Sequence, residues 1–537
     1  MRQITLSVAL EVKPESYQHL SSLLDKLHDK RSSSPSGGTG PFAEFLTSIP
    51  VLHFMSLSLF PSYDYDPLFV IEANFDGDPG PFWAQLEAAI GPEVRSFLAC
   101  CNRPLDSLGP LFDSITVPGS RAPIAPYLEA RSLTPTAYHH GNRGMTCDRI
   151  LAEFELFKET RSELAANDTA YRVRDPVGVH SKLRAALVGR FPWLNDPAPS
   201  RIAFWEDVWD RLKFVAFVLA AIFAFSVPGL ALTLVMPKPS YFVLLGIVFL
   251  VLFAWFKRIA DALPGTETRT RFSLKTFLFG QLVPFLFLLA IYCVVASTLG
   301  TPLSMLLTGH GAVQAWLDML VWLALGLPSA FVTIIGVLVW LRTLERADSS
   351  QNAPPISSSL LREMARREDW IPQNHMGSIV LIKPGILRAI LIRAGHLGVG
   401  LLLRVTARDG YLGSMRTIHF AHWAMVANKS RLMFVSNFDQ TWESYLDDFI
   451  EKAHTGLTTA WSCGVGFPPT RFLIYDGASH GRQFKEWARH SMAVSHFWYS
   501  AYRDLTTEQI ERNYRIALGL RKRVLMETEA AQWLNDL

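Results

Sequence analysis

The sequence predicts an α+β protein in which two copies of a βαββαβ unit flank four transmembrane helices. Of the 537 residues, 49% are hydrophobic and only 18% are charged, and the mean hydropathy is +0.18. These values exclude a disordered chain and are a poor match for an ordinary soluble enzyme. The hydrophobic excess is concentrated in residues 214–341, and the flanking parts repeat one order of strands and helices.

Charge and cysteine content exclude several other classes of protein. The chain has 51 basic and 48 acidic residues, and a net charge of +3 gives no reason to expect a nucleic-acid partner. The five cysteines form neither a C-x-x-C pair nor a cluster with zinc spacing. We therefore expect no metal site and a reducing compartment.

Four apolar runs are candidates to cross a lipid bilayer, which needs about 20 residues of helix; three are long enough alone, and the second, of 16 residues, needs its flanks. They are Phe214–Met236, Tyr241–Phe256, Thr276–Leu299 and Leu320–Leu341. Lys and Arg lie before the first run, between the second and third, and after the fourth, whereas residues 300–314 have none. Because positive charge stays on the cytoplasmic side, we expect a multi-pass protein of the inner (cytoplasmic) membrane with both termini in the cytoplasm.

The soluble parts contain a diverged repeat. Each copy begins with a strand and a helix, continues with two strands and a helix, and is predicted to end in another strand. In the first copy these elements are 4–12, 15–30, 51–57, a strand ending at Asp76, Pro81–Ile90 and Ser114–Val117. In the second they are 378–382, 385–403, 417–423, a strand ending at Asp439, Trp442–Lys452 and Arg471–Tyr475. This is the ferredoxin-like order, and two such sheets can bury their bare faces against each other as a pseudo-dimeric α+β barrel.

The predicted domain boundaries follow from the repeat and the apolar runs. They are 1–120 for the first ferredoxin-like unit, 121–212 for a helical connector, 213–342 for the membrane helices, 343–377 for a linker, 378–480 for the second unit and 481–537 for a C-terminal helical extension. A capping box formed by Thr506 and Gln509 begins the last predicted helix, which extends to about Glu527. The two units can pair within one chain or between chains of a homo-oligomer.

The second unit resembles a family of uncharacterised bacterial multi-pass membrane proteins. The resemblance is carried by 418–423 (IHFAHW), 436–450 (SNFDQTWESYLDDFI), Trp461-Ser462 and Gly466-Phe467-Pro468. In architecture, the paired units resemble the dimeric α+β barrel superfamily, which includes dye-decolourising haem peroxidases and chlorite dismutases. That resemblance implies haem as one candidate cofactor. The distal Asp and Arg and the proximal His of the peroxidases have no residue-by-residue match, so the cofactor stays unassigned.

The densest group of polar residues in the second unit supplies the candidate catalytic residues. The group is Arg416, His419, His422, Asn437, Asp439 and Glu443, and the candidate catalytic residues are Arg416, His419, His422, Asp439, Trp442 and Glu443. Because side chains alternate along a strand, only one of the two histidines is expected to face the barrel interior, where it could serve as a general base. The alternative is structural: Asp439 would cap the following helix, and Asp76 would do the same in the first copy.

A second candidate is Gly477-Ala478-Ser479-His480-Gly481, which fits the G-x-S-x-G pattern of serine hydrolases. No series of βα units precedes it, so a Gly/Ser turn is the favoured interpretation. The leading hypothesis is a membrane-anchored oxidoreductase, haem-peroxidase-like, that acts on a lipophilic small molecule. The alternative is a non-catalytic membrane scaffold or lipid-binding module.

Overall fold

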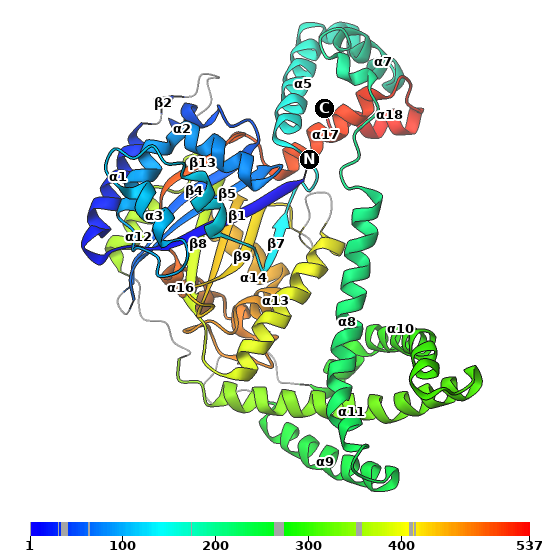
Figure 1. Ribbon diagram of the computed structural model, residues 1–537. Helices are drawn as coiled ribbons and strands as arrows, with labels where there is room; N and C mark the ends of the chain where they lie inside the picture. Colours follow the sequence, from blue (N-terminus) through cyan, green and yellow to red (C-terminus); the bar gives the residue numbers. More distant parts are fainter. Residues whose placement is uncertain are drawn as a thin grey trace.

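The computed structural model describes residues 2–30, 32–33, 41–62, 65–172, 174–261, 273–350, 357–407, 412 and 415–537. It is a mixed α+β structure with antiparallel sheets (Figure 1). The sheets lie on one side of the molecule, a cluster of short helices lies above them, and long apolar helices extend below and beside them.

The first sheet has five strands in the order β13-β4-β5-β1-β6. Their bounds are β1 Gln3–Glu11, β4 Leu52–Phe60, β5 Leu68–Asp76, β6 Ser132–Leu133 and β13 Val494–Ser500. Helices α1 (Tyr17–Asp29) and α2 (Pro79–Ala99) cover its outer face. In α1, Leu20, Leu24 and Leu27 recur at helical spacing and are buried, so the predicted amphipathic helix is confirmed.

The second sheet has four strands in the order β7-β9-β10-β8. Their bounds are β7 Ala137–His140, β8 Gln373–Leu381, β9 Ile418–Val426 and β10 Arg431–Asp439. The helices of this half are α13 Ile386–Thr406, α14 Trp442–Lys452, α15 His454–Trp461 and α16 Gly481–Ser491. The predicted strands and helices of this half up to α14 are confirmed.

The two halves of the chain exchange edge strands. Residues 132–140 pair first with β1, through β6, and then with β9, through β7. Residues 492–500 pair first with β8, through a bridge from Met492 to Ser378, and then with β4, through β13. The two sheets are thus joined at both edges and enclose one set of side chains, called here the inter-sheet core. Its apolar members include Phe60 and Val70 from the first sheet and Met433 from the second.

Two predicted strands are wrong. Residues 114–117 lie at the end of a helix, α3 (Gly109–Thr116), in which Pro110 suits the first turn and Phe112 and Ile115 are buried at helical spacing. Of residues 471–475, Arg471 ends the two-residue strand β11 (Thr470–Arg471) and Tyr475 begins the two-residue strand β12 (Tyr475–Asp476), which pair as a small ribbon. Phe472 and Leu473 have φ of 57° and 55°, so the chain turns between them and cannot continue as a strand. The last strand of each half is instead the exchanged one, and β13 lies inside the predicted helical extension.

A cluster of connector helices has its own apolar core. Its main helices are α5 Cys147–Ala166, α7 Pro176–Leu187, α17 Thr507–Arg521 and α18 Glu527–Leu534. The capping box of Thr506 and Gln509 is confirmed at the start of α17. That helix ends at Arg521, six residues before the predicted end, and α18 begins at Glu527.

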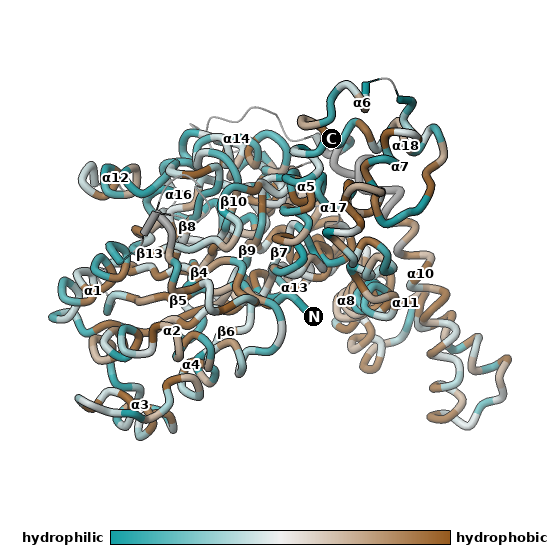
Figure 2. Tube along the Cα trace, turned by 90° about the horizontal axis from the view of Figure 1, so that it is seen from above, coloured by the Kyte–Doolittle hydropathy of each residue, from teal (hydrophilic) through white to brown (hydrophobic). Residues whose placement is uncertain are grey.

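Five helices are long and apolar enough to cross a membrane, where the sequence predicted four. They are α8 Phe204–Leu232, α9 Lys238–Ile259, residues 289–308 of α10 (Leu274–Thr308), α11 Ala312–Arg346 and α13. Hydrophobic residues predominate along α8, α10 and α11 in Figure 2. The fifth, α13, also covers the second sheet, where it contacts β7 and runs beside α8. Its outward residues Ile386 and Ile390 remain exposed.

The end of α11 is bound tightly to the second half. The Glu345 carboxylate accepts hydrogen bonds from the backbone N–H groups of Phe472 and Leu473, both at 2.9 Å. Arg342 donates to the carbonyl oxygen of Thr470 at 2.8 Å and pairs with Glu345 at 3.0 Å. The hydrogen bonds of this buried ion pair on α11 therefore join a candidate membrane helix to the β11–β12 ribbon and the turn within it.

Candidate functional site

A carboxylate is buried in the middle of the inter-sheet core. Glu72 lies on β5 between Ser7 of β1 and Ser56 of β4, its direct cross-strand neighbours. Its exposed fraction is 0%. Because the flanking residues Ile71 and Ala73 face the outer helices, strand alternation turns Glu72 inward. A buried charge of this kind requires partners or a shifted pKa.

The partners of Glu72 satisfy one of its two oxygens. Oε1 accepts hydrogen bonds from the side-chain amides of Asn74 and, across the core at 3.1 Å, Asn437. Oε2 has no hydrogen-bond partner among the described residues, and it lies 3.9 Å from Nε2 of His375. Burial raises the pKa of Glu72 from 4.5 to about 7. Near neutral pH this carboxyl group can therefore both take up and release a proton.

Two histidines of the second sheet share the core. His375 on β8 shares a hydrogen bond through Nδ1 with Ser495 Oγ at 2.7 Å, and His422 on β9 shares one through Nε2 with Ser7 Oγ at 2.7 Å. Burial lowers the pKa of each to about 3, and the nearby His422 contributes to the lowering at His375. Both rings are therefore neutral at neutral pH. Neither His375 Nε2 nor His422 Nδ1 has a hydrogen-bond partner among the described residues.

A cleft of about 130 Å³ leads from the surface to His375. It opens where β8 and β13 diverge: these segments touch at Ser378 and Met492, after which β13 pairs with β4. The residues that line the cleft include His375, Ser495 and Trp498. Glu72 is not among the lining residues, and its Oε2 lies 3.9 Å from Nε2 of His375, which is.

Of the residues predicted from sequence, only His422 lies in the middle of the core. His419 lies at one end of it, where a bulge in the pairing of β9 with β10 turns both His419 and Phe420 inward. The expectation that only one of the two histidines faces inward is therefore wrong, because the bulge breaks the alternation. His419 Nε2 lies 2.7 Å from Asp439 Oδ1.

Asp439 caps a helix, although a different one from the helix predicted. Its Oδ2 accepts a hydrogen bond from the backbone N–H of Thr507, at the start of α17, at 2.8 Å. Asp76 Oδ2 does the same for Cys147 at the start of α5, at 2.7 Å. The helix after Asp439 is capped by Thr441. A sequence gap of 68 residues separates Asp439 from Thr507, so local spacing could not reveal this contact.

The other three predicted residues lie outside the inter-sheet core. Arg416 pairs with Glu508 on α17. Trp442 is buried in the outer core of the second half, with the Arg489 guanidinium 3.7 Å from its ring centroid. Glu443 is on the surface, 3.3 Å from Arg489. These contacts are structural, and they do not bring the three side chains to His422.

Sequence reasoning missed Glu72, His375 and Trp498. Glu72 had a detectable signal, because it is a lone acid in the apolar run 68–73 (LFVIEA) and Val435 stands at its place in the repeat. His375 precedes the predicted start of its strand, which begins at Gln373 rather than residue 378. Trp498 could not be found, because nothing local indicates that β13 joins the opposite sheet.

The cleft does not fit haem. Ligand pockets for molecules of that size usually enclose about 300–1,000 Å³, and this cleft encloses about 130 Å³. The His375 nitrogen that could ligate iron faces Glu72 inside the core. Among the described residues, no three His, Cys, Asp or Glu side chains are grouped so as to hold a metal ion.

Ser479 lacks the setting of a nucleophile elbow. That motif follows a strand of a parallel sheet, whereas β12 is two residues long and pairs antiparallel with β11. Residues 477–479 form a 3₁₀ turn that leads into α16. The Gly/Ser turn is the interpretation that this geometry supports.

The chain was also compared with known proteins. No protein-family profile, curated protein or solved structure matches the chain.

Proposed function

We propose that the two halves are diverged copies of one ferredoxin-like unit and form a pseudo-dimeric α+β barrel. Matching long-range contacts support this. Gln3 donates to the carbonyl oxygens of Asn142 (3.3 Å) and Met145 (2.7 Å), and Gln373 donates likewise to those of Tyr502 (3.1 Å) and Leu505. Unrelated segments would not be expected to make the same pair of contacts.

The barrel is anchored in the inner membrane by its apolar helices, with both termini in the cytoplasm. The distribution of Lys and Arg between the apolar runs supports this orientation. The buried contacts of Glu345 support a rigid attachment of the barrel to the anchor.

The barrel is a proton-transfer enzyme that acts on a small molecule bound in the cleft between β8 and β13. One observation carries this proposal: a buried carboxyl group with a pKa near 7 lies 3.9 Å from a histidine that lines a surface cleft. A general acid–base group works best when its pKa is near the working pH. Perturbed pKa values beside a cleft are typical of active sites.

Each of the residues around Glu72 has a part in the proposed proton transfer. His375 contacts the bound molecule, and its neutral ring carries one proton. A proton from the cleft passes through the Ser495 hydroxyl to His375 Nδ1 while Nε2 releases one to Glu72, so the ring moves the proton without becoming charged. Asn74 and Asn437 hold Glu72 Oε1, which leaves Oε2 to exchange the proton. Ser495 orients the His375 ring.

Solvent-deuterium exchange tests this function. The full chain in lipid nanodiscs is incubated in D₂O with a bacterial small-molecule extract, and mass spectrometry searches for compounds that gain deuterium. Wild type should label at least one compound, and Glu72→Gln and His375→Phe should not. Glu15→Gln, at an exposed carboxylate, is the matched control. Labelling by Glu72→Gln at the wild-type rate would refute the role of Glu72.

A lipid-binding role is the second candidate, and one observation favours it. An apolar pocket of about 320 Å³ lies between α8, α9 and α11, bordered by Gly229, Val332 and Trp340 among others. If this pocket holds an acyl chain, native mass spectrometry of the purified protein should show a bound lipid that Thr333→Phe displaces. The haem-peroxidase-like activity stays a prediction, and the proposed proton transfer does not involve haem.

A further inference from the structure

The place of α13 in the second sheet excludes a membrane crossing, although the helix is long and apolar enough for one. It lies between β8 and β9, and both strands pair with β10 in that sheet. A single crossing would put the two strands on opposite sides of the bilayer. The 11 residues between Thr406 and Ile418 (407–417) are too few to cross back, because a helical crossing needs about 20. α13 therefore lies on the same side of the membrane as the sheets.

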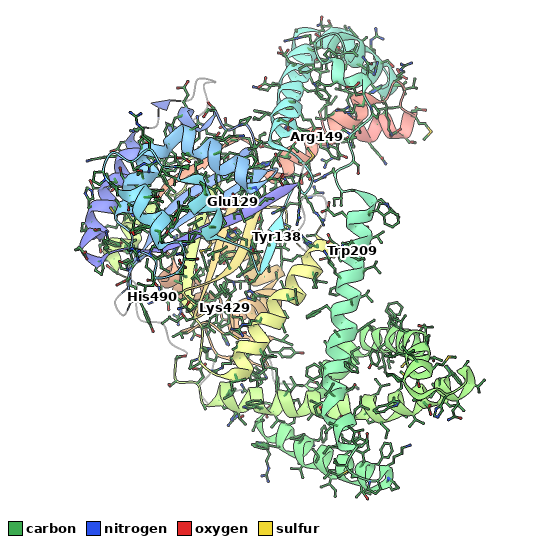
Figure 3. All side chains as sticks on the ribbon, in the orientation of Figure 1. Glu129, Tyr138, Arg149, Trp209, Lys429 and His490 are labelled. Atoms are coloured by element: carbon green, nitrogen blue, oxygen red, sulfur yellow. The ribbon has the colours of Figure 1, made fainter. Side chains whose placement is uncertain are left out.

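Both ends of α13 are fixed to membrane helices. Near its start, Arg388 donates from Nη2 to the carbonyl oxygen of Leu344, at the end of α11, at 3.0 Å. Near its end, Arg404 pairs with Asp210 on α8 at 3.0 Å. Figure 3 labels Trp209, the neighbour of Asp210 on α8, at this end of α13. α13 therefore connects the end of α11 with the beginning of α8.

The two contacts lie at the same level of the membrane. Asp210 precedes the first apolar run and Leu344 follows the fourth, so both lie at the ends of their helices where Lys and Arg gather. Farther along, α8 and α11 cross where Ser329 donates to the carbonyl oxygen of Ser226 at 3.4 Å. This crossing is 16 residues from Asp210 and 15 from Leu344, or about 24 and 23 Å of helix. α13 closes the triangle between the two arms (Figure 1), so it lies along the membrane surface.

One face of α13 carries an exposed apolar stripe. Ile386, Ile390 and Leu397 recur at helical spacing, and their exposed fractions are 77%, 56% and 52%. Ile392 and His396 lie on another face and are buried against the second half of the chain. An exposed stripe of large aliphatic side chains is typical of a surface that contacts an apolar partner. Because both ends of α13 are held by membrane helices, the stripe continues the apolar surface of the anchor.

Basic residues lie at the same level as the stripe. Arg393 is exposed on α13 between Ile390 and Leu397. Lys213 on α8, Lys257 on α9 and Arg346 on α11 are exposed at the adjoining ends of the membrane helices. An arginine beside an apolar stripe can lay its stem along the hydrocarbon and reach a phosphate with its guanidinium. Positive charge at this level favours anionic headgroups.

We propose that α13 lies flat in the cytoplasmic surface of the membrane and binds anionic phospholipid. Ile386, Ile390 and Leu397 enter the boundary between the headgroups and the acyl chains, and Arg393 binds a lipid phosphate. α13 is thus a helix of the membrane surface and not a fifth crossing. This inference rests on the proposed anchor and is independent of the proposed proton transfer.

Spin-label depths in the full chain test this placement, in nanodiscs of phosphatidylcholine and phosphatidylglycerol. Ile386→Cys and Leu397→Cys are labelled separately in a Cys293→Ala background, because the other four native cysteines are buried. Power saturation with oxygen and a nickel chelate then gives the depth of each label. Both should lie about 5–10 Å below the lipid phosphates. Val251→Cys, exposed on α9, should lie deeper, and Leu105→Cys, exposed on the first half, should lie in water.

Lipid-specific quenching tests the headgroup contact. A bimane attached to Leu397→Cys, in the same background, should be quenched more strongly by brominated phosphatidylglycerol than by brominated phosphatidylcholine. Arg393→Gln should lower this preference about fivefold, and Arg393→Lys should keep most of it. Arg362→Gln, at an exposed arginine on α12 (Ser358–Ala365), should quench as the protein with Arg393 and Arg362 intact does.

Three results would overturn the proposal. Depths at positions 386 and 397 that differ by about 16 Å would show that α13 crosses the membrane. Labels in water at both positions would show that the stripe does not contact lipid. An unchanged preference in Arg393→Gln would remove the phosphate contact. If only the α13 labels lie in water, the anchor stands, whereas a label at Val251 in water would refute the anchor itself. Deuterium exchange tests the proton transfer separately.

Discussion

Replacing Glu72 by Gln should stabilise the protein at alkaline pH. The folded state raises the Glu72 pKa from 4.5 to about 7, so it binds this proton more tightly than the unfolded chain does. The contribution of this bound proton to the free energy of unfolding is fully present below about pH 4.5 and is lost as the pH rises through about 7. Each pKa unit between the two states corresponds to about 1.4 kcal/mol, which gives a loss of about 3 kcal/mol by about pH 8.

Gln mimics the neutral carboxyl group, because its oxygen can accept from Asn74 and Asn437 and its amide can approach His375. We therefore expect Glu72→Gln to be more stable than wild type near pH 8 by about 3 kcal/mol and nearly equal to it near pH 5. Denaturant titrations of the full chain, followed by tryptophan fluorescence, measure the difference, with Glu15→Gln as control. If the difference in free energy of unfolding between Glu72→Gln and wild type is the same at pH 8 as at pH 5, the pKa of Glu72 is not raised.

Three further predictions concern other contacts. Asp439→Ala should lower the free energy of unfolding by about 2–4 kcal/mol, because it removes both the cap of α17 and the partner of His419; Asp439→Asn should cost less. Glu345→Ala should speed proteolysis near Phe472, because the N–H group of Phe472 loses its acceptor. Glu363→Ala is the control, and equal rates of proteolysis in the two variants would contradict the proposed attachment of α11. Tags at both termini should react with a membrane-impermeant reagent only after permeabilisation, and labelling of intact cells would reverse the orientation.

Much of the fold could be predicted because its signals are local. The apolar runs gave four of the five candidate membrane helices, and the repeated strand–helix pattern located β1, β4, β5, β9 and β10. The fifth helix, α13, has two uses on its two sides. It buries Leu387 and Ile392 against the rest of the protein and leaves Ile386 exposed. The sequence therefore could not distinguish a helix that packs on the sheet from one that contacts lipid.

The site could be predicted only in part because its contacts are not local. His422 was identified from its place in a strand, but its partner Ser7 lies 415 residues away in the chain. Glu72 meets Asn437 across a gap of 365 residues. Such contacts depend on how the two sheets face each other, and the exchange of edge strands, which sets that arrangement, leaves no mark in the hydrophobic pattern of either half.

The exchanged strands also determine when the protein can finish folding during synthesis. β4 is nine buried residues long, and among the residues that the structure describes, the strand that pairs with its edge opposite β5 is β13, which begins at Val494. The ribosome must therefore complete the apolar helices and most of the second half before that edge is covered. An exposed, apolar strand edge invites association with other chains. Membrane insertion of the helices thus falls within the period when the first half is most prone to aggregate, and a chain truncated before Val494 would retain that exposed edge.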